Sequence, residues 1–212
     1  MGPSDMPKEP PKSMEVRPAK ANPEVSKFLD EWINPGPTDK SGGKMGTTVS
    51  LGQIDQIDIP PGWQEGTAQK PTGGSSLFRE FHPADNPEVR LCFYYRGRRI
   101  SEEAGQAFHS MLEQPPHVLK PEELQPLREV LREKLNSKDF NLLFAKTEEM
   151  NGKRVLVVEG AYNNSQLKTR ELFVDSDGTG TAVQEIYYQA PRNDYARFQP
   201  AALSALKSIR WK

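Results

Sequence analysis

The sequence predicts an α+β fold: an α-β-α sandwich in which a central antiparallel sheet carries helices on both faces. Three observations predict it. Strand-like runs joined by hairpin signals dominate residues 48–212. Helical periodicity separates the early strands from the later ones and returns at the end of the chain. The run Val155–Val158 is apolar at every position, which is typical of a central strand covered on both faces.

The first strands precede residue 100. Residues 48–59, TVSLGQIDQIDI, alternate loosely between apolar and polar positions and predict one strand, which ends at Pro60-Pro61. Two further strands are expected over 76–82 and 89–97. The run PADNPE between them is rich in turn-forming residues, so these two strands are predicted to pair as a hairpin.

Two helices come next. Over residues 101–114 the apolar positions recur at helical spacing and form one stripe, which comprises Ala104, Ala107, Phe108, Met111 and Leu112. A second helix is expected over 121–136. Pro126 lies within that window, where it either belongs to the first turn or kinks the helix.

Four strands follow in two hairpins, and a helix closes the chain. The first hairpin turns at Asn151-Gly152, the strongest two-residue hairpin signal. The second turns at DSDGTG, residues 175–180. The closing segment is mostly helical and begins at a capping Asn193 or Asp194. The four strands are predicted over 140–150, 153–162, 169–175 and 181–189.

The DSDGTG segment resembles the start of a calcium-binding loop. A loop that starts at Asp175 should place a bidentate Glu at its twelfth position, but that position is Ile186, within an apolar strand. The flanking segments are also strands instead of helices. Asp177-Gly178 favours a tight turn, so we predict a hairpin turn here and no metal site.

The first 47 residues differ in composition from the rest. They are rich in Pro and Gly and are predicted to be a flexible tail, with a single α+β domain over 48–212. Residues 23–33 within the tail predict a short amphipathic helix, capped by Asn22. Its apolar stripe is the predicted partner-binding site and comprises Val25, Phe28, Leu29, Trp32 and Ile33. Such a helix packs on its own domain, docks on another protein or lies on a membrane surface, and its acidic residues disfavour anionic lipid.

Charge and hydropathy exclude several classes of function. The chain has 28 basic and 29 acidic residues and a net charge of -1, so bulk charge does not favour nucleic acid as a partner. No apolar run is long enough to span a membrane, and the N-terminus lacks a secretion signal, so a cytoplasmic protein is expected.

The residues that could carry chemistry are few. Cys92 is the only cysteine and is expected to be a buried small hydrophobe. The histidines His82, His109 and His117 show no metal-ligand spacing, so no metal or cofactor is predicted. An arginine cluster surrounds FYYRGRR and is interpreted as strand-end residues paired with nearby acids; it comprises Arg90, Arg96, Arg98 and Arg99.

From about residue 49 onward, the order of elements resembles the PsbP-like superfamily. The motifs that carry this resemblance are IPPGW, NGKRVLVVEG, EIYYQAP and ALKSIRW. The resemblance implies an α-β-α sandwich around a central antiparallel sheet, in a domain that binds or assembles other proteins without catalysing a reaction. It implies no particular functional residues. The absence of a lumen-targeting leader argues against a photosystem role.

The sequence therefore favours a non-catalytic interaction or assembly protein whose helix at 23–33 engages a protein partner. No catalytic residue is predicted. The alternative is a ligand-binding or enzymatic sandwich with a pocket between sheet and helices. That alternative requires Cys92, His82 or His109 to converge in one cleft. An exposed edge strand would also allow a homodimer.

Overall fold

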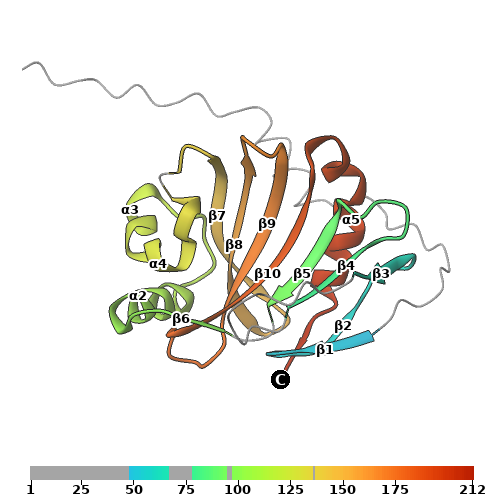
Figure 1. Ribbon diagram of the computed structural model, residues 1–212. Helices are drawn as coiled ribbons and strands as arrows, with labels where there is room; N and C mark the ends of the chain where they lie inside the picture. The colour runs from blue at the N-terminus through green and yellow to red at the C-terminus, as the bar shows by residue number, and fades with distance from the viewer. Residues whose placement is uncertain (1–47, 67–77, 95–96, 136) are drawn as a thin grey trace, which may run out of the picture. The chain divides into compact units, whose positions relative to one another are not determined.

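The computed structural model describes residues 48–66, 78–94, 97–135 and 137–212 (Figure 1). All of these belong to one unit of the chain, Gly43–Lys212. The tail predicted over 1–47 and its helix at 23–33 lie outside the described residues, so both stay predictions.

Among the described residues, a large sheet of eight antiparallel strands organises the domain (Figure 1). Its strand order is β3-β4-β5-β10-β9-β8-β7, and β6 pairs with β10 beside β5. The α+β class and the antiparallel sheet are thus confirmed. The strands are β3 (Trp63–Glu65), β4 (Phe78–Pro83), β5 (Arg90–Tyr94), β6 (Arg98–Arg99), β7 (Phe140–Met150), β8 (Lys153–Tyr162), β9 (Leu167–Asp175) and β10 (Ala182–Pro191).

The three predicted hairpins are present. Strands β4 and β5 pair, β7 pairs with β8 through Asn151-Gly152, and β9 pairs with β10 through DSDGTG. Asn151 and Gly152 have φ values of 50° and 81°, the left-handed backbone that a two-residue hairpin turn requires. The turn-forming residues in the sequence therefore predicted these strand pairings correctly.

A smaller sheet corrects the prediction for residues 48–59. These residues form two strands, β1 (Thr48–Leu51) and β2 (Ile54–Asp58), where the sequence predicted one. The chain reverses between them at Gly52, whose φ of 55° is easily adopted by glycine. The third strand, β11 (Arg210–Trp211), comes from the end of the chain and pairs with β2.

The helices also depart from the predictions. The first predicted helix is present as α2 (Glu102–Glu113), with Ser101 as its cap. The second is broken into short pieces, because Pro126 lies in a 3₁₀ turn and Arg132 takes a φ of 51°. These pieces are α3 (Pro121–Leu124), η1 (Gln125–Leu127), α4 (Arg128–Leu131) and η2 (Arg132–Lys134).

The closing helix, α5 (Arg192–Lys207), starts earlier than predicted. Pro191 takes the capping position, so neither Asn193 nor Asp194 is the cap. Pro200 lies inside the helix. None of the helices among the described residues is long and apolar enough to cross a membrane.

The sheet contributes to two separate clusters of buried apolar residues. The alternation along β8 shows the division: Val155 and Val157 belong to one cluster, and Leu156 and Val158 belong to the other. The first cluster includes side chains of α5, β1 and β2. The second includes side chains of α2, η1 and α4. The prediction that this run of β8 is buried throughout is confirmed.

Candidate functional site

The predicted partner-binding stripe lies outside the described residues. Val25, Phe28, Leu29, Trp32 and Ile33 all fall within the first 47 positions, so this site stays a prediction. The described domain does place the other candidate residues, and their geometry can be compared with what the sequence suggested.

Cys92, His82 and His109 do not converge. Cys92 lies on β5, is fully buried and interacts with Tyr187 on β10. His82 lies on β4, and its ring contacts the carbonyl of Pro83 at 2.8 Å. His109 lies on α2, and its Nδ1 is 3.0 Å from Asp175 Oδ2. None of the three cavities described below is lined by more than one of these residues, so these cavities do not provide the shared cleft that the enzymatic alternative requires.

The thiol and phenols near β5 are poor nucleophiles. Burial raises the pKa of Cys92 to about 12. Burial also raises the pKa of Tyr94 and of Tyr187, with further contributions from Glu185 for Tyr94 and from Cys92 for Tyr187. At neutral pH these groups therefore stay protonated, and their hydroxyls can serve as hydrogen-bond donors.

The DSDGTG turn packs against α2. A Cβ atom at Gly180 would collide with the backbone carbonyl of Gly105, so the two backbones meet with no room for a side chain. Asp177 stays charged: burial acts to raise its pKa, but hydrogen bonds from Thr181 and Thr179 outweigh burial and lower it. The turn is therefore a helix-docking element, stabilised by its own side chains.

This docking creates a cleft of about 440 Å³ beside His109. Asp175 accepts the backbone N–H of Gly178 with Oδ1 and contacts His109 with Oδ2. Arg154 donates to the carbonyls of Leu112 and Glu113 at the end of α2. The carboxylate of Asp175 and the guanidinium of Arg154 are both occupied by the fold, which indicates a structural role for this region.

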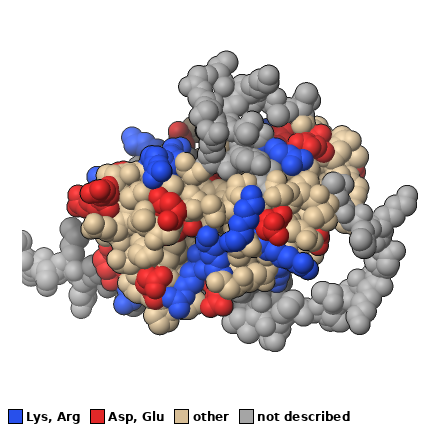
Figure 2. Space-filling model, turned by 90° about the horizontal axis from the view of Figure 1, so that it is seen from below, with Lys and Arg blue, Asp and Glu red and all other residues tan. Residues whose placement is uncertain are grey.

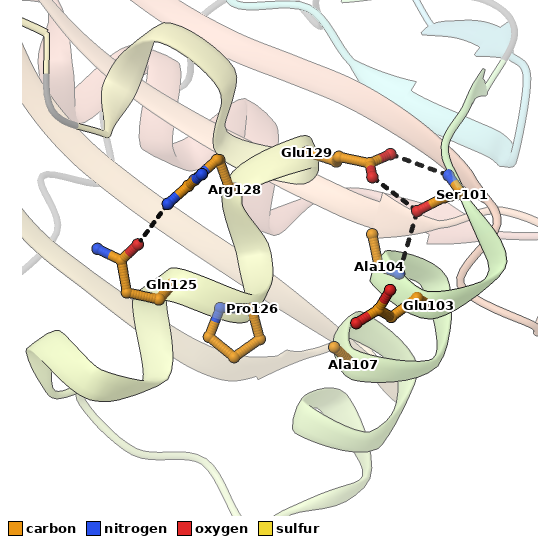
Figure 3. Close-up of a pocket in the computed structure, with 8 residues that line it drawn as sticks. All are labelled: Ser101, Glu103, Ala104, Ala107, Gln125, Pro126, Arg128 and Glu129. Atoms are coloured by element: carbon orange, nitrogen blue, oxygen red, sulfur yellow. Dashed lines mark hydrogen bonds between the residues drawn. The ribbon is translucent and has the colours of Figure 1, made fainter.

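A second cavity, of about 280 Å³, lies between α2 and the η1–α4 segment (Figure 3). Two polar interactions cross its lining. Glu129 accepts both the backbone N–H and the hydroxyl of Ser101, at 2.9 and 2.6 Å, and Arg128 donates to the amide oxygen of Gln125 at 3.0 Å. The Ser101 hydroxyl in turn caps α2 by accepting the N–H of Ala104 (Figure 3). Glu129 therefore fixes the start of α2.

The third cavity, which we call the arginine cleft, has a volume of about 370 Å³. It brings together segments that are far apart in the sequence: the end of β5, strand β6, the junction of α4 with η2, and β10. Its lining residues are Tyr94, Gly97, Arg98, Arg99, Arg132, Val183 and Glu185.

Two of the three guanidinium groups in the arginine cleft have carboxylate partners. Arg98 donates to Glu185 Oε1 at 3.3 Å and to the carbonyl of Val130 at 3.0 Å. Arg99 donates to Asp177 Oδ2 at 3.1 Å, and its side chain is 77% exposed. These pairs, together with Arg90 and Glu80, confirm the interpretation of the arginine cluster; Arg96 lies outside the described residues.

Arg132 differs from the other two. Within the described part of the chain it has no carboxylate partner. Its backbone, with φ of 51° and ψ of -126°, has a conformation that glycine adopts far more readily than residues with a side chain. A non-glycine residue in such a region costs on the order of 1–3 kcal/mol. The chain therefore places a charged side chain at the cleft at the expense of local strain.

A buried ion pair adjoins Arg132. Lys134 Nζ lies 3.1 Å from Glu171 Oε2, and the two side chains are 6% and 5% exposed. Burial raises the pKa of Glu171, and the ammonium group of Lys134 opposes this shift. The pair fixes η2 to β9 and thereby holds the segment that carries Arg132.

Charges of both signs are mixed on the face of the domain that Figure 2 shows. Figure 2, which shows the domain from below, has a band of Lys and Arg bordered by Asp and Glu on both sides. Local arrangements of charge, and not a broad field of one sign, will therefore decide what this face binds.

Sequence reasoning missed Arg132 and Glu185 as cleft residues. Arg132 falls within the single helix that the sequence predicted over 121–136. No local pattern pairs Glu185 with an arginine 87 positions earlier. The pairing of β6 with β10 places Arg98 opposite Val183, two residues before Glu185. A prediction of that strand register could have found the pair.

Comparison with known proteins identifies the fold. No family model matches the sequence, and no curated protein matches it. The solution structure of cyanobacterial PsbP from Synechocystis is similar with a TM-score of 0.51 at 10% identity, over 84% of this chain and 100% of that one. A Pseudomonas aeruginosa protein of unknown function is similar with a TM-score of 0.45 at 15% identity, over 80% and 99%. The domain thus has a PsbP-like fold, as the resemblance implied.

Proposed function

We propose that this protein is a non-catalytic interaction or assembly factor, in which a PsbP-like domain presents a surface and the helix predicted at 23–33 engages a protein partner. One observation carries the proposal: three of the side chains that could carry chemistry are either buried and protonated or bonded to other groups of the domain. Cys92 has a raised pKa, and His109 and Glu129 are bonded to their own structural partners.

The layering of the domain supports the same proposal. We infer an α-β-α sandwich from the two apolar clusters, since α5 contributes to one and α2 with α4 contributes to the other. Such a sandwich buries both faces of its sheet and leaves edges, turns and helices for contact with partners. The boundary at residue 48 and the cytoplasmic location stay predictions.

The test begins with amide hydrogen exchange on the full-length protein at low, monomeric concentration. Rapid exchange over residues 23–33 is expected if the apolar stripe is free to engage a partner. Strong protection would contradict that role, because it would show that the helix packs on its own domain.

A variant pair then tests partner capture. Phe28→Ala with Trp32→Ala removes the two largest groups of the stripe and should reduce capture of a partner at least tenfold, without a change in the melting temperature of the domain. Ser26→Ala with Lys27→Ala, on the polar side of the same helix, is the matched control and should leave capture unchanged. Equal capture by both variants would refute the docking role.

The alternative, a ligand-binding sandwich with a pocket between sheet and helices, is favoured by one specific observation. The arginine cleft carries a guanidinium with no carboxylate partner among the described residues, and this does not depend on the helix at 23–33.

A further inference from the structure

The arginine cleft has an excess of one positive charge. Arg98 and Arg99 are each paired with a carboxylate, Glu185 and Asp177 respectively. Arg132 lines the same cleft, and no carboxylate of the described residues is paired with it. Among the described residues, three guanidinium groups and two carboxylates therefore leave an excess of about one positive charge, which a bound anion can match.

The geometry of a guanidinium selects the kind of anion. Its planar donors match the two oxygens of a carboxylate, and the pair is strongest when both hydrogen bonds form. A single negative charge balances Arg132. A dianion such as phosphate would carry a second charge toward Glu185, whose side chain is only 14% exposed. The charge count therefore favours a monoanion over a dianion.

The remaining lining supplies an apolar wall. Tyr94 lines the cleft, with its ring centroid 6.3 Å from that of Tyr187, which lies outside the lining. Val183 also lines the cleft and belongs to the buried cluster beneath α2 and α4. The Tyr94 hydroxyl stays protonated because burial raises its pKa, so it can donate a hydrogen bond. A cavity of about 370 Å³ is large enough for a carboxylate attached to a small planar or aliphatic body.

The backbone at Arg132 is consistent with a positioned ligand contact. The side chain projects from a strained residue between α4 and η2, and the buried pair Lys134–Glu171 fixes the segment that follows. Strain of this kind persists where the surrounding structure determines the conformation, and it is concentrated at binding and catalytic sites.

We propose that the arginine cleft is a carboxylate-binding site in which Arg132 forms the ion pair, Arg98 and Glu185 hold the cleft open, and Tyr94 and Val183 contact the body of the ligand. The carboxylate belongs either to a small organic acid or to an acidic side chain of a bound peptide. Both sources present the same chemistry to Arg132.

The first experiment titrates the full-length protein with benzoate, followed by amide NMR and calorimetry. Benzoate should bind with a Kd on the order of 1 mM and shift the amides of Tyr94, Gly97 and Arg132. Benzamide, which has the same shape without the charge, should shift them at least tenfold less at equal concentration. Identical responses to both compounds would overturn the proposal.

Variants identify the residue that binds. Arg132→Gln should weaken benzoate binding at least tenfold, whereas Arg128→Gln, four positions earlier on α4, should leave it unchanged. Arg132→Lys should retain part of the affinity because it keeps the charge and loses the second hydrogen bond. Unchanged affinity in Arg132→Gln, with the fold intact by NMR, would refute the assignment.

Two further arms separate the sources of the carboxylate. A short peptide with one central Glu is compared with its Gln counterpart and with benzoate in competition. Tighter binding of the Glu peptide than of benzoate, with displacement of benzoate, assigns the site to an acidic peptide. Weaker binding of that peptide assigns it to a small acid. Equal binding of the Glu and Gln peptides together with no benzoate binding would exclude a carboxylate site altogether.

Discussion

Two charged regions on opposite faces of the sheet differ in how their charges are matched. On the face of Val155 and Val157, strands β7, β8 and β9 carry a group that we call the sheet cluster, comprising Lys146, Glu148, Glu159, Lys168 and Arg170. Each of its cations contacts a carboxylate. On the opposite face, the arginine cleft leaves Arg132 without a carboxylate partner among the described residues.

The charged side chains of the sheet cluster are also more deeply buried than those of the arginine cleft. Arg170 and Glu159 are 2% and 1% exposed, and their nitrogen and oxygen atoms lie 3.2 Å apart. The cleft residues Arg99 and Arg132 are exposed. A charge removed from water requires a partner inside the domain, whereas a charge at an open cleft can take its partner from solution. The sheet cluster is therefore structural, and the arginine cleft is suited to binding.

The largest expected effect follows from breaking the sheet cluster. Glu159→Gln leaves the guanidinium of Arg170 buried with its principal partner neutralised, and it also removes the contact from Lys168 at 2.9 Å. The free energy of unfolding should fall by about 3 kcal/mol or more. Urea denaturation monitored by circular dichroism measures this loss.

The matched control is Glu149→Gln, at an exposed position of β7, which should change the stability by less than about 0.5 kcal/mol. If Glu159→Gln does not fold, the double variant Glu159→Met with Arg170→Met gives the second measurement. Removing both charges should cost less than removing one. A single variant as stable as the wild type would show that the sheet cluster is not structural.

In the arginine cleft, a substitution at Arg132 is expected to change the stability less, and to raise it instead of lowering it. Arg132→Gly relieves the strain of a φ of 51°, and this gain is offset in part by the greater backbone entropy of glycine when unfolded. The domain should therefore be as stable as the wild type, or more stable by up to about 1 kcal/mol. Benzoate binding should be lost in the same variant.

Arg128→Gly is the matched control for strain, because Arg128 has a regular helical backbone. The same change there should lower the stability by about 1 kcal/mol. The pair of variants separates the two properties of Arg132, since one substitution would raise stability while removing binding. Equal destabilisation by both variants would mean that the backbone of Arg132 is not strained.

Local sequence patterns predicted the elements but not the cleft. The hairpin at Asn151-Gly152 could be predicted because its turn depends on two adjacent residues with left-handed backbone. The break at Arg132 could not be predicted, since a charged residue at a positive φ contradicts local propensity. Its conformation depends on tertiary packing through Lys134 and Glu171, which are 37 positions apart in the sequence.

Strand β8 shows the same limit of prediction from local sequence. An apolar run such as Val155–Val158 predicts burial on both faces, and this is confirmed. It does not predict that Glu159, the next residue, is equally buried, because a carboxylate is normally exposed unless it is paired. Its partner Arg170 becomes adjacent only when β8 and β9 pair.

The smallest effect on stability is expected from a partly exposed pair on the surface, His117 and Glu123. His117 Nε2 lies 3.0 Å from Glu123 Oε1, and both side chains are 29% exposed. The carbonyl of Pro115 and then the carboxylate of Glu123 raise the pKa of His117. The backbone N–H of Lys120 and then His117 lower the pKa of Glu123.

The sign of the pH dependence follows from these directions. Stabilisation from His117 is complete below its unfolded pKa of 6.5 and is lost as the pH rises through the higher folded value. Stabilisation from Glu123 is present above 4.5 and is lost as the pH falls through its lower folded value. In His117→Gln the decrease in urea midpoint between about pH 6 and pH 8 should be smaller than in the wild type. Identical profiles would show that the pair His117–Glu123 contributes nothing to the stability of the fold.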